Sequence, residues 1–222
     1  MTRYAYRVLI VLSGVMISAG APGGLNAQTW EIGPMGGVAR IKKTNLGSLE
    51  QSDTAGEDSR LIGKQSYGLR VTLNTKGYYG HEIGYVRTKA TFRGSIAGEG
   101  SAPRVQKEDA VFIQQASYNF LAYFMPSRER WRPFFAMGFQ VHKSGAPNFA
   151  EFSGSSTRNY GFNYGGGLKL LLGKNALLRL DARDILTGKP YNLFFTETFT
   201  GAPQSGGLLR QLELSLGFSI AF

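Results

Sequence analysis

The last eleven residues alternate strictly between apolar side chains and small or polar ones. The apolar side chains occupy every second position, at Leu212, Leu214, Leu216, Phe218, Ile220 and Phe222. Because successive side chains on a strand point to opposite faces, this segment predicts a strand with one wholly apolar face. The sequence stops on an aromatic residue inside that strand, with no polar tail. This favours a strand that faces lipid.

The first 27 residues have the order of a secretory signal peptide. Arg3 and Arg7 precede an apolar run from Val8 to Ile17, and small and turn residues follow as far as Ala27. The apolar run is about half as long as a membrane-spanning helix needs. We therefore expect a cleaved signal peptide over residues 1–27 and a single domain over residues 28–222. The sequence contains no cysteine, which excludes a lipid-modified cysteine, disulfides and thiol chemistry.

Composition agrees with aromatic, glycine-rich strands. The 222 residues include 30 glycines, 15 phenylalanines and 11 tyrosines, and only 18% are charged. The net charge is +10, which is compatible with an anionic partner. Export argues against nucleic acid, and the anion at hand is then the phosphate of lipopolysaccharide. The alternative is an ordinary solvated basic surface, since isolated surface charges contribute little.

Period-two patterns define eight segments. They span residues 30–41, 67–74, 79–92, 115–124, 133–141, 161–170, 178–183 and 212–222. The links between them alternate in length: residues 74–77, 125–130 and 173–175 are short, whereas 42–66, 93–109, 144–158 and 187–207 are long. Short periplasmic turns and long external loops are typical of outer-membrane barrels. We therefore predict an all-β fold, an eight-stranded antiparallel up-and-down transmembrane β-barrel.

Aromatic residues gather at one end of the predicted strands. Trp30, Tyr79, Phe124, Trp131 and Phe222 fall at the ends assigned to the periplasmic rim. Amphipathic rings favour a membrane interface, so these residues indicate an aromatic girdle.

Charges in the strand centres fall on the inward side. The inward charged residues are Arg70, Glu82, Lys169, Arg179, Asp181, Arg183 and Glu213. The interior of an eight-stranded barrel is just wide enough for side chains, so an open pore is disfavoured. Enclosed charges have to pair, and the pattern predicts a structural salt-bridged plug.

Four segments carry a resemblance to a known family. Residues 132–139, 162–168, 178–183 and the last strand resemble small outer-membrane β-barrel proteins of the OmpA and OmpX type. The resemblance implies a bacterial outer-membrane location in contact with membrane lipid and lipopolysaccharide. It also implies that Phe218, Ile220 and Phe222 form a signal for the barrel assembly machinery. We expect a monomer that needs no cofactor.

One constellation favours a different function. His142 and Ser144, with Glu151 nearby, resemble the His-x-Ser element of outer-membrane lipid A deacylases, in which histidine activates a serine nucleophile. The residue after Ser144 is Gly145, where the deacylase pattern has asparagine. Three further strands follow, whereas the deacylase motif lies close to the C-terminus. His81 is the other histidine and falls on the outward face, so no metal site is expected. We therefore predict a non-enzymatic barrel with a structural or surface-recognition role through its external loops. The alternatives are a lipid A-modifying hydrolase and, third, a narrow channel.

Overall fold

The computed structural model describes residues 28–43, 45–50, 58–75, 77–98, 100, 102–127, 129–152, 155–156, 158–193 and 208–222. The predicted signal peptide lies outside the described residues, so its cleavage remains a prediction. No helix in the described part of the chain is long and apolar enough to cross a membrane.

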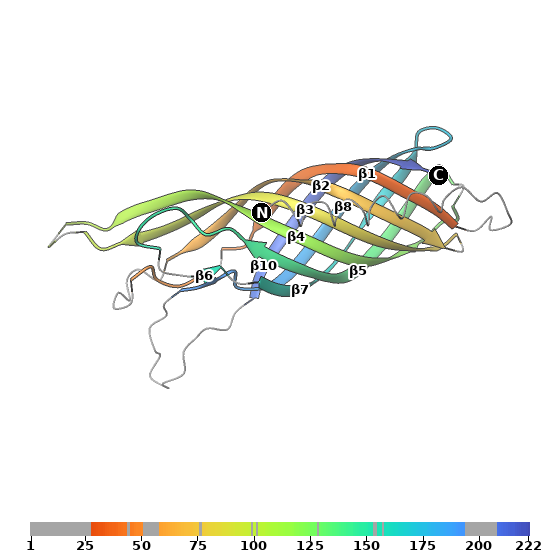
Figure 1. Ribbon diagram of the computed structural model, residues 1–222. Coiled ribbons are helices and arrows are strands. Elements are labelled where there is room, and N and C mark those ends of the chain that lie inside the picture. Colours follow the sequence, from red (N-terminus) through yellow and green to blue (C-terminus); the bar gives the residue numbers. More distant parts are fainter. Residues whose placement is uncertain are drawn as a thin grey trace, which may run out of the picture.

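Eight antiparallel strands close into a barrel (Figure 1). They are β1 (Gln28–Ile41), β2 (Arg60–Thr75), β3 (Tyr79–Ile96), β4 (Val105–Tyr123), β5 (Trp131–Ser144), β7 (Arg158–Leu171), β8 (Ala176–Gly188) and β10 (Leu208–Ala221). Each strand pairs with its neighbours in the sequence, and β1 closes the barrel against β10. Trp30 and Phe222 exchange two backbone hydrogen bonds of 3.0 and 2.9 Å at this closure. The predicted fold class is confirmed.

The two ends of the barrel differ. Short links join β2 to β3, β4 to β5 and β7 to β8 at one end, which we call the turn end. The longer connections lie at the opposite end, which we call the loop end. In Figure 1 the hairpin of β3 and β4 extends beyond the other strands at the loop end, and the C-terminus lies at the turn end.

Several strands are longer than the sequence predicted. β2 begins at Arg60 instead of Tyr67, β3 continues to Ile96 and β4 begins at Val105, so the predicted loops 42–66 and 93–109 are partly strand. A register shift between Gly63 and Ser66 shows a β-bulge, which breaks the period-two pattern that the prediction followed. The parts of β3 and β4 nearest the loop end carry polar residues on both faces. They therefore lack the alternation of apolar and polar residues from which the other strands were predicted.

A second, short sheet joins two of the connections at the loop end. It pairs β6 (Ser155–Ser156) with β9 (Tyr191–Asn192), between the connections from β5 to β7 and from β8 to β10. The sequence did not predict it, because two-residue strands leave no periodicity.

Polarity is inverted relative to a soluble barrel. Large apolar side chains on the outward face are exposed, for example Ile83 at 66% and Phe139 at 71%, whereas most buried charged side chains point inward. Inward glycines allow the close packing of the strands. A Cβ atom at Gly138 would overlap the backbone oxygen of Tyr118 on β4, so this position requires glycine.

Candidate functional site

Five charged side chains form a network across the middle of the lumen, which we call the central ion cluster. Its members are Arg70 on β2, Glu82 on β3, and Arg179, Asp181 and Arg183 on β8. All five are buried. All five belong to the predicted inward set, because each lies at a strand position whose side chain points into the lumen.

The ion pairs of this cluster span the full width of the barrel. Glu82 accepts hydrogen bonds from Arg179 at 2.5 Å and from Arg183 at 2.7 Å. In the closed strand order, β3 and β8 are four strands apart in both directions and therefore stand opposite each other. Asp181 is 2.6 Å from Arg70 and 2.8 Å from Arg179. The cluster therefore ties opposite walls together.

Lys169 lies nearer the turn end and pairs separately. Its Nζ atom is 2.5 Å from Glu31 and donates to the Tyr123 hydroxyl at 2.6 Å. Asn74 also donates to Glu31 at 2.7 Å, and the Arg132 guanidinium stacks 3.8 Å from the centre of the Tyr123 ring. The prediction placed Lys169 in one plug with the arginines, whereas the structure shows a second layer. Glu31 was missed as its partner, although on β1 it alternates with Trp30 and Ile32 and so has the position of an inward residue.

Glu213 forms no ion pair among the described residues. It is buried on β10, and its Oε2 atom has no hydrogen-bond partner there. It borders an internal cavity of about 20 Å³ together with Gln140 and Asn163, among others. A cavity of that volume holds about one water molecule, so it does not form a passage.

The loop end of the lumen is filled by apolar side chains, which we call the outer apolar cluster. Its buried members are Ile41, Leu46, Leu49, Leu61, Ala90, Phe92, Val111, Ile113, Tyr191, Leu193 and Leu209. Strand residues point in from the wall, and residues of the connections fold onto them. Phe92 packs edge-on against Phe152 and Tyr191, with ring centres 5.7 and 5.5 Å apart. The Tyr191 hydroxyl donates to the Gly145 carbonyl at 2.6 Å.

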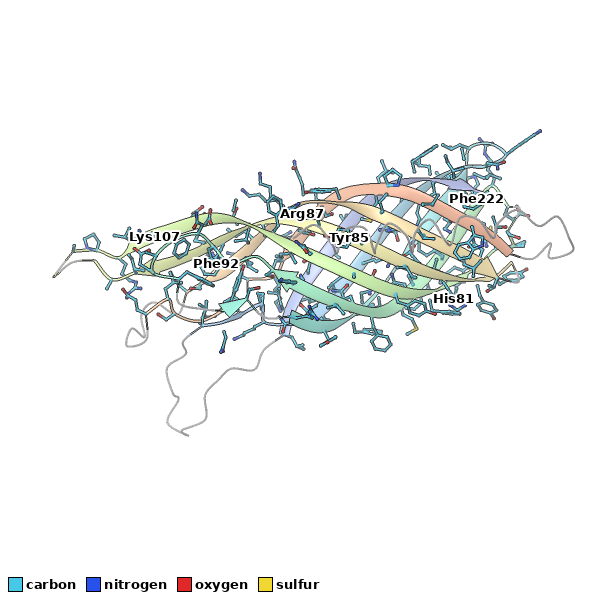
Figure 2. The ribbon with its side chains drawn as sticks, in the orientation of Figure 1. His81, Tyr85, Arg87, Phe92, Lys107 and Phe222 are labelled. Carbon is cyan, nitrogen blue, oxygen red and sulfur yellow. The ribbon has the colours of Figure 1, made fainter. Side chains whose placement is uncertain are left out.

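Figure 2 shows the separation of the two ends: Phe92 and Lys107 lie toward the loop end, and His81 and Phe222 toward the turn end. Sequence reasoning missed the outer apolar cluster because it took the whole lumen to be polar. The sequence did contain a signal: Ala90 and Phe92 on β3, and Val111 and Ile113 on β4, are apolar residues at positions whose side chains point inward.

The deacylase candidates do not assemble into a reactive pair. His142 and Ser144 both point into the lumen from β5, two residues apart, which separates them by about 6.6 Å along the strand. His142 Nε2 and Ser144 Oγ have no hydrogen-bond partner among the described residues. Glu151 lies in a connection and pairs with Lys107 at 3.2 Å. A hydrogen bond from its own backbone amide and that ion pair lower the pKa of the Glu151 carboxyl.

No group of three or more histidines or carboxylates among the described residues could hold a metal ion. His81 lies on the outward face, where its Nδ1 atom is 2.7 Å from the Tyr118 hydroxyl.

The residues of the predicted girdle and assembly signal lie at the turn end and on the outward face. Trp30, Tyr79, Phe124, Trp131 and Phe222 are all exposed. Phe218 and Ile220 share the outward face of β10 with Leu216 and are also exposed. Recognition of this segment by the assembly machinery stays a prediction.

Comparison with known proteins supports the fold. No family model matches the chain, and no curated protein matches it significantly. The outer membrane protein OprG from Pseudomonas aeruginosa superposes with a TM-score of 0.55 at 12% identity, over 90% of this chain and 98% of OprG. This likeness shows that the chain has the fold of a small outer-membrane barrel.

Two further structures are similar over most of the chain. The N-terminal β-barrel domain of Pseudomonas aeruginosa OprF has a TM-score of 0.46 at 15% identity, over 87% of this chain and 97% of that domain. Escherichia coli outer membrane protein W has a TM-score of 0.42 at 17% identity, over 88% and 97% of the two chains. The likeness to OprG confirms, at the level of the fold, the resemblance to small outer-membrane barrels that the sequence predicted.

Proposed function

We propose that this chain is a monomeric barrel of the bacterial outer membrane, with a closed lumen, that acts by recognition at its external surface. The observation that carries the proposal is the set of ion pairs from Glu82 to Arg179 and Arg183, which joins opposite walls. A charge network of this kind is costly to open, because each separated ion would be left buried without a partner.

Two further observations support an external role. The outer apolar cluster fills the loop end of the lumen, so solutes would meet a second barrier there. The outward face carries exposed apolar residues along the strands, which fits contact with lipid. With the interior filled, the loops and the outer rim are the surfaces left for a partner, and loops on a rigid scaffold commonly carry binding.

The absence of cysteine makes orientation directly testable. Ala150→Cys places a thiol on an exposed connection at the loop end, and Lys174→Cys places one on an exposed turn at the turn end. In intact cells, a membrane-impermeant maleimide should label Ala150→Cys. It should label Lys174→Cys only after the outer membrane is permeabilised.

Equal labelling of the two variants in intact cells, or recovery of the protein in the soluble fraction, would contradict the proposal. Heat-modifiable migration on gels, checked for both variants, shows that the barrel is folded in each.

A further inference from the structure

A basic hollow lies on the outward face at the loop end, outside the lumen. It spans the adjacent strands β3, β2, β1, β10 and β8 and has a volume of about 790 Å³. Among the described residues, six basic side chains line it against one carboxylate, that of Asp184. The basic residues are Arg40, Lys42, Lys43, Arg60, Arg93 and Arg210. We call this site the rim hollow.

Most of this positive charge is not neutralised by a carboxylate among the described residues. Arg210 pairs with Asp184 at 2.5 Å, and Arg93 pairs with Glu108 at 2.5 Å. The other four basic residues form no ion pair with any carboxylate in the described part of the chain; they are Arg40, Lys42, Lys43 and Arg60. An anion in the hollow would therefore meet several free cations.

The register adds a second observation. Arg60 on β2 stands directly opposite Arg93 on β3. Like charges in directly opposed positions destabilise a pair of strands. Glu108 forms an ion pair with Arg93 and not with Arg60. A phosphate between the two guanidinium groups would relieve this repulsion, and arginine binds phosphate well through paired hydrogen bonds.

The hollow is amphipathic along the barrel axis. Leu212 and Ile62 form part of its lining. On the turn-end side of the hollow, Val38 lies on the same outward face, two residues before Arg40 on β1, and is 56% exposed. The same order recurs on β3, where Figure 2 shows Arg87 on the loop-end side of Tyr85. An occupant should therefore have anionic groups toward the loop end and apolar chains alongside the strands.

We propose that the rim hollow binds a phosphorylated lipid of the outer leaflet, of the lipid A type, through its headgroup phosphates. The proposal rests on the function proposed above, because only an outer-membrane position brings such a lipid to this face. Arg40, Lys42 and Arg60 hold the phosphates, and Ile62 and Leu212 contact the first part of the acyl chains.

The test uses the full mature chain folded in detergent micelles, with bound lipid measured by native mass spectrometry. The variant Arg40→Gln/Lys42→Gln/Arg60→Gln removes three charges from the hollow. The matched control Lys89→Gln/Lys143→Gln/Arg158→Gln removes three exposed, outward charges near the same end but outside the hollow. Heat-modifiable migration verifies that every variant has folded.

Bis-phosphorylated lipid A should bind the wild type, and the hollow variant should weaken binding by roughly tenfold or more, whereas the control variant changes it by less than about twofold. Dephosphorylated lipid A should bind the wild type at least about tenfold more weakly than the phosphorylated form. The second comparison needs no variant.

Equal losses in the two triple variants would overturn the proposal in favour of diffuse electrostatic attraction. Equal binding of the dephosphorylated lipid would also overturn it. Displacement of lipid A by an equal concentration of inorganic phosphate would show that the hollow takes free phosphate, which contradicts a lipid site. The result of the cysteine labelling above does not depend on lipid binding. Failure of the lipid site and failure of the outer-membrane assignment can therefore be told apart.

Discussion

The central ion cluster and the outer apolar cluster fill the same lumen with opposite chemistry. All members of the first come from strands, and its ion pairs connect β3 and β2 with β8 across the barrel. The second combines wall residues such as Phe92 with residues of the connections, such as Leu46 and Tyr191. The ion cluster therefore fastens wall to wall, whereas the apolar cluster fastens the connections to the wall. The two should respond differently when one member is removed.

The largest effect should follow from removing a carboxylate of the central ion cluster. Asp181→Ala removes the carboxylate that Arg70 pairs with and leaves Arg179 and Arg183 with Glu82 alone. Glu82→Ala leaves Arg179 and Arg183 with Asp181 as their one carboxylate partner among the described residues. Each change should lower the free energy of unfolding by about 3 to 5 kcal/mol, measured by urea titration in lipid vesicles.

The matched control is Asp184→Ala on the same strand. Its partner Arg210 is about half exposed, so loss of this pair should cost less than about 1 kcal/mol. A change below about 0.5 kcal/mol for Asp181→Ala would mean that the cluster does not hold the walls together.

Truncation in the outer apolar cluster should act locally. Phe92→Ala removes the ring that Phe149, Phe152 and Tyr191 pack against. In the connection between β5 and β7, the Gly145 amide donates to the Phe112 carbonyl on β4, and the Phe152 amide donates to the Phe149 carbonyl. The hydrogen exchange of these two amides should accelerate by about tenfold or more, while the amides of β8 keep most of their protection. Uniform acceleration over the whole barrel would remove the distinction between the two clusters.

The sequence predicted the central ion cluster better than the outer one, for a physical reason. Inward charges such as Arg179 and Asp181 stand out against apolar outward neighbours, so parity alone assigns them to the lumen. Partners are harder to predict, because contacts across the lumen depend on tilt and stagger. Lys169 therefore had no assigned partner, and Glu31 was missed. At the loop end, the bulge near Gly63 and the loss of contrast between the faces hid the strand extensions. Phe92 lay within a predicted strand, but its part in an apolar cluster was missed because the lumen was taken to be polar.

A smaller effect is expected for Phe222→Ala. Its two backbone hydrogen bonds with Trp30 persist, so folding of purified protein in vitro should change by less than about 1 kcal/mol. If the ring belongs to the assembly signal, the amount of folded protein in the outer membrane should nevertheless fall severalfold, judged by heat-modifiable migration. Leu216→Ala, which truncates another outward apolar residue of β10, is the control. Unchanged membrane levels for Phe222→Ala would count against the signal.

The smallest expected effect concerns chemistry. Because His142 Nε2 and Ser144 Oγ have no hydrogen-bond partner among the described residues and Glu151 pairs with Lys107, the purified protein should release no fatty acid from lipid A. Release above a boiled-protein control, abolished by both Ser144→Ala and His142→Ala, would establish the hydrolase instead.

The central claim is that the lumen is closed at two levels, and current across a planar lipid bilayer tests it most directly. Wild-type protein, with insertion verified by heat-modifiable migration of the same preparation, should give no steady conductance above the protein-free membrane. A reproducible ohmic conductance from the wild type, increased by Asp181→Ala, would show that ions pass the central ion cluster and would contradict the closed lumen.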